Sequence, residues 1–146
     1  MALFLFADSI LNNKPIDVFN HGKMVRDFTY VGDIVESIKR LIVKPPKENQ
    51  SWNSDNPDIP FSSAPYQLFN IGNGAPVKLM NYINALESAL GKKGVYNMMN
   101  IQPGDVPATH ADTSLLEKYI SFKPDTDIKD GIDSFVSWYL KYYKIV

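Results

Sequence analysis

The segment of the sequence that most constrains the fold is residues 15–33, where two runs of strand-forming residues precede a run typical of a helix. Alternating apolar residues predict a short strand over residues 16–19, and the β-forming run at 28–31 predicts a second strand after a Gly-containing turn. Asp33 has the residue type and spacing of a helix cap, which predicts a helix over 33–43. The segment therefore predicts a β-hairpin that continues directly into a helix.

One arginine, Arg26, lies in this segment next to Asp27. A guanidinium held on a strand presents five N–H donors in a fixed plane, and this geometry suits an anionic oxygen acceptor such as a phosphate. The alternative is an ordinary surface ion pair between the two neighbours. The residues alone leave both interpretations open.

The rest of the chain alternates between helical and extended patterns. Apolar spacing predicts further helices over residues 2–11, 78–90, 113–120 and 128–143, and strands over 66–71 and 95–99. Five prolines predict a loop over residues 45–65. We therefore expect a single α/β domain over residues 1–146, with too few strands for a complete sheet.

The helix predicted over residues 33–43 is clearly amphipathic. Its apolar face consists of Ile34, Val35, Ile38, Leu41 and Ile42.

Composition excludes several classes of function. A net charge of −1 provides no basic surface for nucleic acid, and no apolar run approaches the roughly 18 residues of a membrane span. The chain has no cysteine, which excludes disulfides and thiolate chemistry. His21 and His110 are far apart and lack carboxylates at ligand spacing, so we expect no metal site. We expect neither a nucleic-acid partner nor a membrane partner, and a cytoplasmic protein.

Four stretches of the sequence, in this order, resemble the extended short-chain dehydrogenase family, which includes nucleotide-sugar epimerases and dehydratases. These stretches are residues 15–34, 69–77, 102–112 and 131–143. Within the family, the similarity is greatest to the UDP-glucuronate 4-epimerases. The resemblance implies an α/β fold that forms the C-terminal, substrate-binding portion of such an enzyme, with an incomplete Rossmann sheet and without the N-terminal NAD-binding half.

The resemblance also implies which functional groups this chain lacks. The family holds NAD at a Gly-rich turn that opens a helix, and the nearest string here, residues 72–74, has no third glycine opening a helix. Tyr119 and Lys123 have the spacing of the family's catalytic Tyr-x-x-x-Lys pair. Lys123 precedes Pro124, however, and we expect the helix to end there. We therefore expect no catalytic and no cofactor-binding residue, and we assign NAD to the full-length parent.

Five substrate-binding residues are implied by the resemblance. Asp17 and Phe19 correspond to strand residues that recognise uracil through main-chain groups, and Arg26 corresponds to an arginine that contacts the diphosphate. Gln102 stands where several galactose-type epimerases have a second arginine, and Asp105 corresponds to a residue that accepts hydrogen bonds from ribose hydroxyls. The alternatives are an ordinary edge strand at the first two positions and a plain β-turn around Asp105.

The function implied by the resemblance is the UDP-sugar-binding region of an NAD-dependent nucleotide-sugar epimerase. The full-length parent would invert C4 through a 4-keto intermediate, while this chain alone would be inactive. A UDP- or dTDP-sugar 4,6-dehydratase or decarboxylase of the same family, and a non-catalytic binding module, are the alternatives. The partners implied are a UDP-sugar, the missing N-terminal Rossmann half and a second copy in a homo-oligomer.

Overall fold

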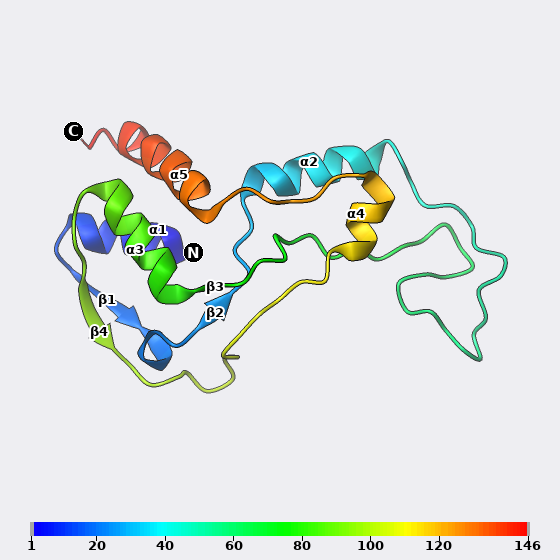
Figure 1. The fold of residues 1–146 in the computed structure, drawn as a ribbon, viewed down its shortest axis with the longest axis horizontal. Helices are drawn as coiled ribbons and strands as arrows, with labels where there is room; N and C mark the ends of the chain where they lie inside the picture. Colours follow the sequence, from blue (N-terminus) through cyan, green and yellow to red (C-terminus); the bar gives the residue numbers. More distant parts are fainter. Residues whose placement is uncertain (1, 146) are drawn as a thin grey trace. The chain divides into compact units, whose positions relative to one another are not determined.

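The computed structural model describes residues 2–145, which fall into two compact units (Figure 1). The first unit comprises residues 2–28, 75–110 and 126–145, and the second comprises residues 29–74 and 111–125. The chain forms a mixture of helices and short strands, which confirms the expected α/β class. No helix in this part of the chain is both long and apolar enough to cross a membrane.

The first unit contains two small sheets. Strand β1 (Pro15–Val18) pairs in parallel with β4 (Val95–Met98), and Ile16 lies opposite Tyr96. Side chains alternate along β1, so that Ile16 and Val18 are buried while its other two residues are exposed. Strand β2 (Val25–Arg26) pairs antiparallel with β3 (Val77–Lys78).

Three helices complete the core of the first unit (Figure 1). They are α1 (Ala2–Leu11), α3 (Leu79–Leu90) and α5 (Ile128–Tyr142). Helix α1 packs against β1, and α3 packs against both α1 and α5. The buried core cluster consists of Ile10, Ile16, Val18, Tyr82, Ile83, Leu86, Ile132 and Val136. Full burial of one such aliphatic side chain stabilises the fold by about 1.5–3 kcal/mol, so these residues dominate the stability of the unit.

The second unit is built from α2 (Val31–Ile42), α4 (Ser114–Ile120) and the loops that join them. The ring of Tyr119 lies 4.9 Å from that of Phe69, and the guanidinium of Arg40 lies 4.7 Å from the ring of Phe122. Lys44 and Tyr119 each donate a hydrogen bond to the main-chain oxygen of the other. Polar and aromatic contacts therefore tie α2 to the segment around α4.

The predicted helices are confirmed to within about two residues at each end. The first helix has the expected bounds, and α3 ends at Leu90, directly before Gly91, which has a left-handed φ of +64°. The strand predicted at 95–99 is found as β4. Each of these elements carries its own periodic pattern, which is why the sequence indicates it without knowledge of its neighbours.

The predicted hairpin is wrong. Strand β1 pairs with β4 and not with β2, and the second strand is Val25–Arg26 and not residues 28–31. Strand β1 ends at Val18, so that Phe19 opens a 3₁₀ turn, Phe19–Gly22. Helix α2 begins at Val31 after an N-cap at Tyr30, so the prediction that Asp33 caps it is also wrong.

One further expectation fails in the second unit. Residues 66–71 do not form a strand, and the pairing described there is a single bridge between Phe61 and Gln67. The apolar face predicted for α2 is largely exposed, whereas Asp33 and Ser37 of that helix are buried. The exposed apolar residues of α2 are Val31, Val35, Ile38 and Ile42, which are 44–72% exposed and are called here the α2 stripe.

Candidate functional site

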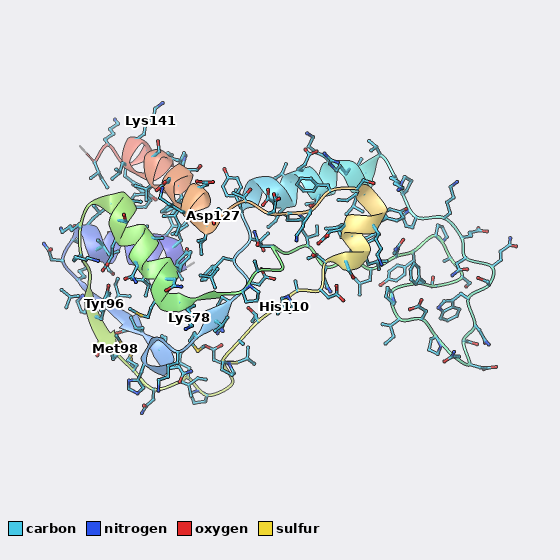
Figure 2. All side chains as sticks on the ribbon, in the orientation of Figure 1. Lys78, Tyr96, Met98, His110, Asp127 and Lys141 are labelled. Atoms are coloured by element: carbon cyan, nitrogen blue, oxygen red, sulfur yellow. The ribbon has the colours of Figure 1, made fainter. Side chains whose placement is uncertain are left out.

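Strand β2 carries Arg26 and is held along both of its edges. On one side β3 pairs with it, and on the other side the Val25 amide donates to the oxygen of Pro107 at 2.9 Å. The Thr109 amide donates to the oxygen of Val25 at 3.1 Å. In Figure 2, Lys78 marks β3 and His110 marks the end of the segment 107–109, with β2 between them. A strand of two residues is thus fixed by its neighbours.

With the described residues, 2–145, the Arg26 guanidinium makes two hydrogen bonds. Nη1 donates to the oxygen of Val25 at 2.9 Å, and Nη2 donates to Oδ1 of Asp105 at 2.9 Å. The side chains of Arg26 and Asp105 are 24% and 34% exposed, so the ion pair lies in the surface layer. The alternative considered from the sequence was an ion pair between Arg26 and its neighbour Asp27. The structure shows a different pair, because the carboxylate that binds Arg26 comes from a residue 79 positions later.

Asp105 closes a tight turn, in agreement with the β-turn that the sequence analysis gave as an alternative. Its amide donates to the oxygen of Gln102 at 3.1 Å, and Gly104 has a φ of +84°, a conformation that favours glycine. Oδ1 of Asp105 also accepts from the Val106 amide at 2.8 Å. The carboxylate is therefore oriented by its own main chain, while Gln102 lies exposed at the start of the same turn.

Thr109 is a positioning residue to which the sequence interpretation assigned no role. Its Oγ1 accepts a hydrogen bond from the Asp27 amide at 3.2 Å, directly beyond Arg26. The hydroxyl thus connects the segment after the turn to the end of β2. The signal that could have indicated it is its place within the matched stretch 102–112, where a β-branched hydroxyl residue follows the turn.

The other two predicted site residues lie at the end of β1. Asp17 is exposed and accepts a hydrogen bond from the Asn97 amide group on β4 at 2.8 Å. Phe19 is half-buried at the start of the 3₁₀ turn. Hydrogen bonds described over residues 2–145 join Arg26 to Asp105 and tie Asp105 to Gln102 through the turn, but they join neither Asp17 nor Phe19 to Arg26.

The end of β1 is nevertheless connected to the segment that leads into the turn. The Met99 amide donates to Val18 at 3.0 Å, and the His21 amide donates to Met99 at 2.9 Å. Nε2 of His21 and Oδ1 of Asn100 are 3.0 Å apart. Asn20, His21 and Gly22 are all left-handed, with φ of +49°, +48° and +76°, so three consecutive residues reverse the chain here.

Chemically, the arrangement offers hydrogen-bond donors. The guanidinium has five N–H groups, of which two donate to Val25 and Asp105, so three remain for an acceptor. The exposed carboxamide of Gln102 adds a neutral donor and acceptor. These groups suit recognition of an anionic oxygen ligand.

The Tyr119/Lys123 pair does not have the geometry of a catalytic pair on one helix. Helix α4 ends at Ile120, and Ser121 takes a left-handed φ of +50°, so Lys123 lies beyond the helix as expected. The Tyr119 hydroxyl donates to the oxygen of Lys44 at 3.0 Å. The Tyr119 side chain therefore acts in the packing of the second unit, whereas Lys123 is exposed.

Comparison with known proteins gives consistent results. Residues 1–54 match the sequence model of the NAD dependent epimerase/dehydratase family. Protein CapI of Staphylococcus aureus is 54% identical over 144 residues, which are 99% of this chain and 43% of that protein. A probable UDP-glucuronate 4-epimerase of Rhizobium meliloti is 43% identical over 145 residues, 99% of this chain and 42% of its own length.

A solved structure with the same fold is the UDP-glucuronic acid 4-epimerase from Bacillus cereus, in complex with UDP-glucuronic acid and NAD. It superposes with a TM-score of 0.77 and 23% identity, over 98% of this chain and 40% of that one. This likeness confirms the expected fold of the extended short-chain dehydrogenases. The chain spans less than half the length of the curated relatives that it matches.

Proposed function

We propose, from its place in the NAD-dependent epimerase/dehydratase family, that this chain forms the C-terminal, UDP-sugar-binding portion of an enzyme similar to UDP-glucuronate 4-epimerases. The observation that carries the proposal is the placement of Arg26. A partly exposed guanidinium is held on β2 beside the turn 102–105, with three N–H groups available to a ligand. A diphosphate is the acceptor whose charge and geometry match this donor best.

We assign the five residues the following roles. Arg26 donates to the diphosphate, and Gln102 adds a weaker, neutral hydrogen bond. The main chain of Asp17 and Phe19 offers a donor and an acceptor to the uracil edge, and Asp105 accepts from a ribose hydroxyl. In support of this, hydrogen bonds connect the end of β1 to the segment that leads into the turn carrying Asp105.

NAD is assigned to residues outside this chain. The glycines at 72 and 74 are followed by strand β3 and not by the N-terminus of a helix, so they do not fit a dinucleotide turn. Hydride transfer at C4 of the sugar is the chemistry that NAD supplies in a 4-epimerase. The residues of this chain would hold the UDP portion while that chemistry takes place.

The remaining part of the full-length enzyme is the partner that we propose for the second unit. The α2 stripe is exposed, and residues 66–71 have the composition of a strand but form, among residues 2–145, a single bridge between Gln67 and Phe61. Tyr66 and Leu68 in that segment are 51% and 54% exposed. A sheet contributed by the rest of the enzyme would cover the stripe and pair with this segment.

The proposal is tested by titrating the 146-residue chain with UDP and with NAD in a calorimeter. We expect binding of UDP and no measurable binding of NAD. Arg26→Ala should weaken UDP binding about ten- to a hundredfold, which corresponds to losing one charged hydrogen bond of about 1.5–3 kcal/mol. Arg40→Ala is the matched control, because it removes the other arginine of the chain from a helix outside the site.

Two results would contradict the assignment: unchanged UDP affinity after Arg26→Ala, or tight binding of NAD by the chain alone. Co-expression with the remaining part of a relative, followed by NMR of the sugar product, distinguishes an epimerase from a dehydratase or decarboxylase. A C4-inverted sugar supports the proposal, and a 4-keto-6-deoxy or decarboxylated sugar contradicts it.

A further inference from the structure

We infer that Asp105 is a positioning residue that holds the Arg26 guanidinium ready for an anionic ligand and remains bound to it when that ligand arrives. The inference rests on the proposed function, because it concerns how the same site recognises a diphosphate. It goes beyond the assignment of Asp105 as an acceptor for a ribose hydroxyl.

The carboxylate of Asp105 is the fixed member of the pair. Its Oδ1 accepts from the Val106 amide at 2.8 Å, and its own amide closes the turn onto Gln102 at 3.1 Å. The following residues are hydrogen-bonded to β2 through Pro107 and Thr109. The turn therefore holds Oδ1 in place beside β2 before any ligand binds.

The guanidinium is the member that needs to be held. An arginine side chain is long and has many rotamers, and fixing it on binding costs conformational entropy. The contacts with Asp105 and Val25, each 2.9 Å long, fix both terminal nitrogens in advance. Because these contacts occupy two of its five N–H groups, a phosphate can bind the others without separating the pair.

A competing effect has the opposite sign. A carboxylate next to the site repels an anion, so a purely electrostatic account predicts that removing Asp105 strengthens diphosphate binding. A positioning role predicts that the same change weakens it. A role confined to the ribose predicts weaker UDP binding but no loss of affinity for a ligand without ribose.

The test therefore uses two probes, UDP and inorganic pyrophosphate, on the 146-residue chain. We expect Asp105→Ala to weaken the binding of both probes about tenfold, as expected for a hydrogen bond that involves a charged group. Asp105→Asn keeps an oxygen that can accept from Arg26 and Val106, so we expect it to bind both probes within about threefold of the original chain. In the Arg26→Ala background, Asp105→Ala should cause no further loss of pyrophosphate affinity.

The matched control is Asp133→Ala, which removes one carboxylate from an exposed ion pair with Lys129 on α5 and should leave both affinities unchanged. Pyrophosphate binding that is unchanged or stronger in Asp105→Ala would overturn the inference. An equal loss with and without Arg26 would overturn it too, because the two residues would then act independently.

A second measurement is independent of any ligand. Nitrogen relaxation at Nε of Arg26 should show a more mobile side chain in Asp105→Ala than in the original chain, and equal mobility would contradict the positioning role. If the proposed function itself is wrong, the binding measurements give a different result. The original chain would then bind neither UDP nor pyrophosphate, while the relaxation measurement would still decide whether Asp105 holds Arg26.

Discussion

Arg26 and Gln102 offer two different kinds of hydrogen-bond donor to the proposed ligand. Replacing Arg26 with Lys keeps the charge but loses the planar fork, so we expect Arg26→Lys to recover only part of the affinity lost in Arg26→Ala. Gln102→Ala removes a neutral hydrogen bond, and we expect it to reduce UDP affinity by only about 0.5–1.5 kcal/mol. Calorimetry on the three variants ranks their UDP affinities. A larger loss of affinity for Gln102→Ala than for Arg26→Ala would contradict the prediction.

Glu87 is a charged residue buried in the first unit. Its side chain is 1% exposed, and its carboxylate accepts from Lys93 Nζ at 2.7 Å, from the Gly94 amide at 2.8 Å and from the Tyr96 hydroxyl. Burial raises the pKa of Glu87, but the three hydrogen bonds and the charge of Lys93 together lower it by more, so the pKa lies below its ordinary value of 4.5. Burial and the bond to Glu87 raise the pKa of Tyr96 to about 12.

The lowered pKa of Glu87 predicts a pH dependence of stability. Because the folded state holds the carboxylate charged, the stabilisation is present above the ordinary pKa of 4.5 and is lost as the pH falls through the lowered value. We expect Glu87→Gln to lower the free energy of unfolding at neutral pH by about 1–3 kcal/mol and to flatten its decline below pH 4.5. Urea unfolding at several pH values measures both effects.

Asp133→Asn is the control for that series, because it changes an exposed ion pair that should contribute little to stability. An unchanged acid decline in Glu87→Gln would show that other carboxylates control the acid stability of the chain.

At the scale of residues, the sequence indicated Arg26 as a candidate for anion binding but did not indicate the carboxylate that binds it. Asp105 lies 79 positions away, and only the folding of β2 against residues 107–109 brings the two together. The same holds for Thr109, whose hydroxyl contacts a residue 82 positions earlier. Spacing within a motif cannot report such contacts, because they depend on the register between distant segments.

Among the structural elements, two left-handed glycines allow the cost of backbone strain to be separated from that of packing. Gly91 has a φ of +64° and no neighbouring atom within 4 Å of where a Cβ would be. We therefore expect Gly91→Ala to lower the free energy of unfolding by only about 1 kcal/mol, through backbone strain alone. Gly22 has a φ of +76°, and an added Cβ would lie 2.8 Å from the Met80 side chain.

We therefore expect Gly22→Ala to lower the free energy of unfolding by roughly 1–3 kcal/mol in total, which is more than the loss expected for Gly91→Ala. Thermal or urea unfolding of both variants provides the comparison, and equal losses would show that Met80 moves aside at no cost.

The helices could be predicted from the sequence, because each carries a complete amphipathic pattern within its own residues. The two-residue strands β2 and β3 could not, because their residues become strands only through pairing with each other. Residues 66–71 illustrate the reverse case: their composition indicates a strand, but the partner that would define it is not described among residues 2–145.

For the molecule as a whole, the exposed α2 stripe predicts self-association of the isolated chain. Apolar side chains that line one helix face without cover favour contact between copies. We expect the chain to associate with increasing concentration in sedimentation velocity, and Ile38→Lys to reduce that association without lowering the unfolding temperature, because Ile38 is 44% exposed. Lys39→Gln on the same helix is the control, and a chain that stays monomeric at high concentration would contradict the prediction.

The parallel pairing of β1 with β4 has a consequence for how this chain is synthesised. Residues 80 positions apart meet in that pair, and the first unit is assembled from three separate segments of the chain. At a synthesis rate of about 5–20 residues per second, the apolar residues of β1 leave the ribosome roughly 4–16 s before those of their partner strand do. During that interval Ile16 and Val18 are exposed, so we expect the nascent chain to depend on chaperones that bind short apolar segments until β4 has been made.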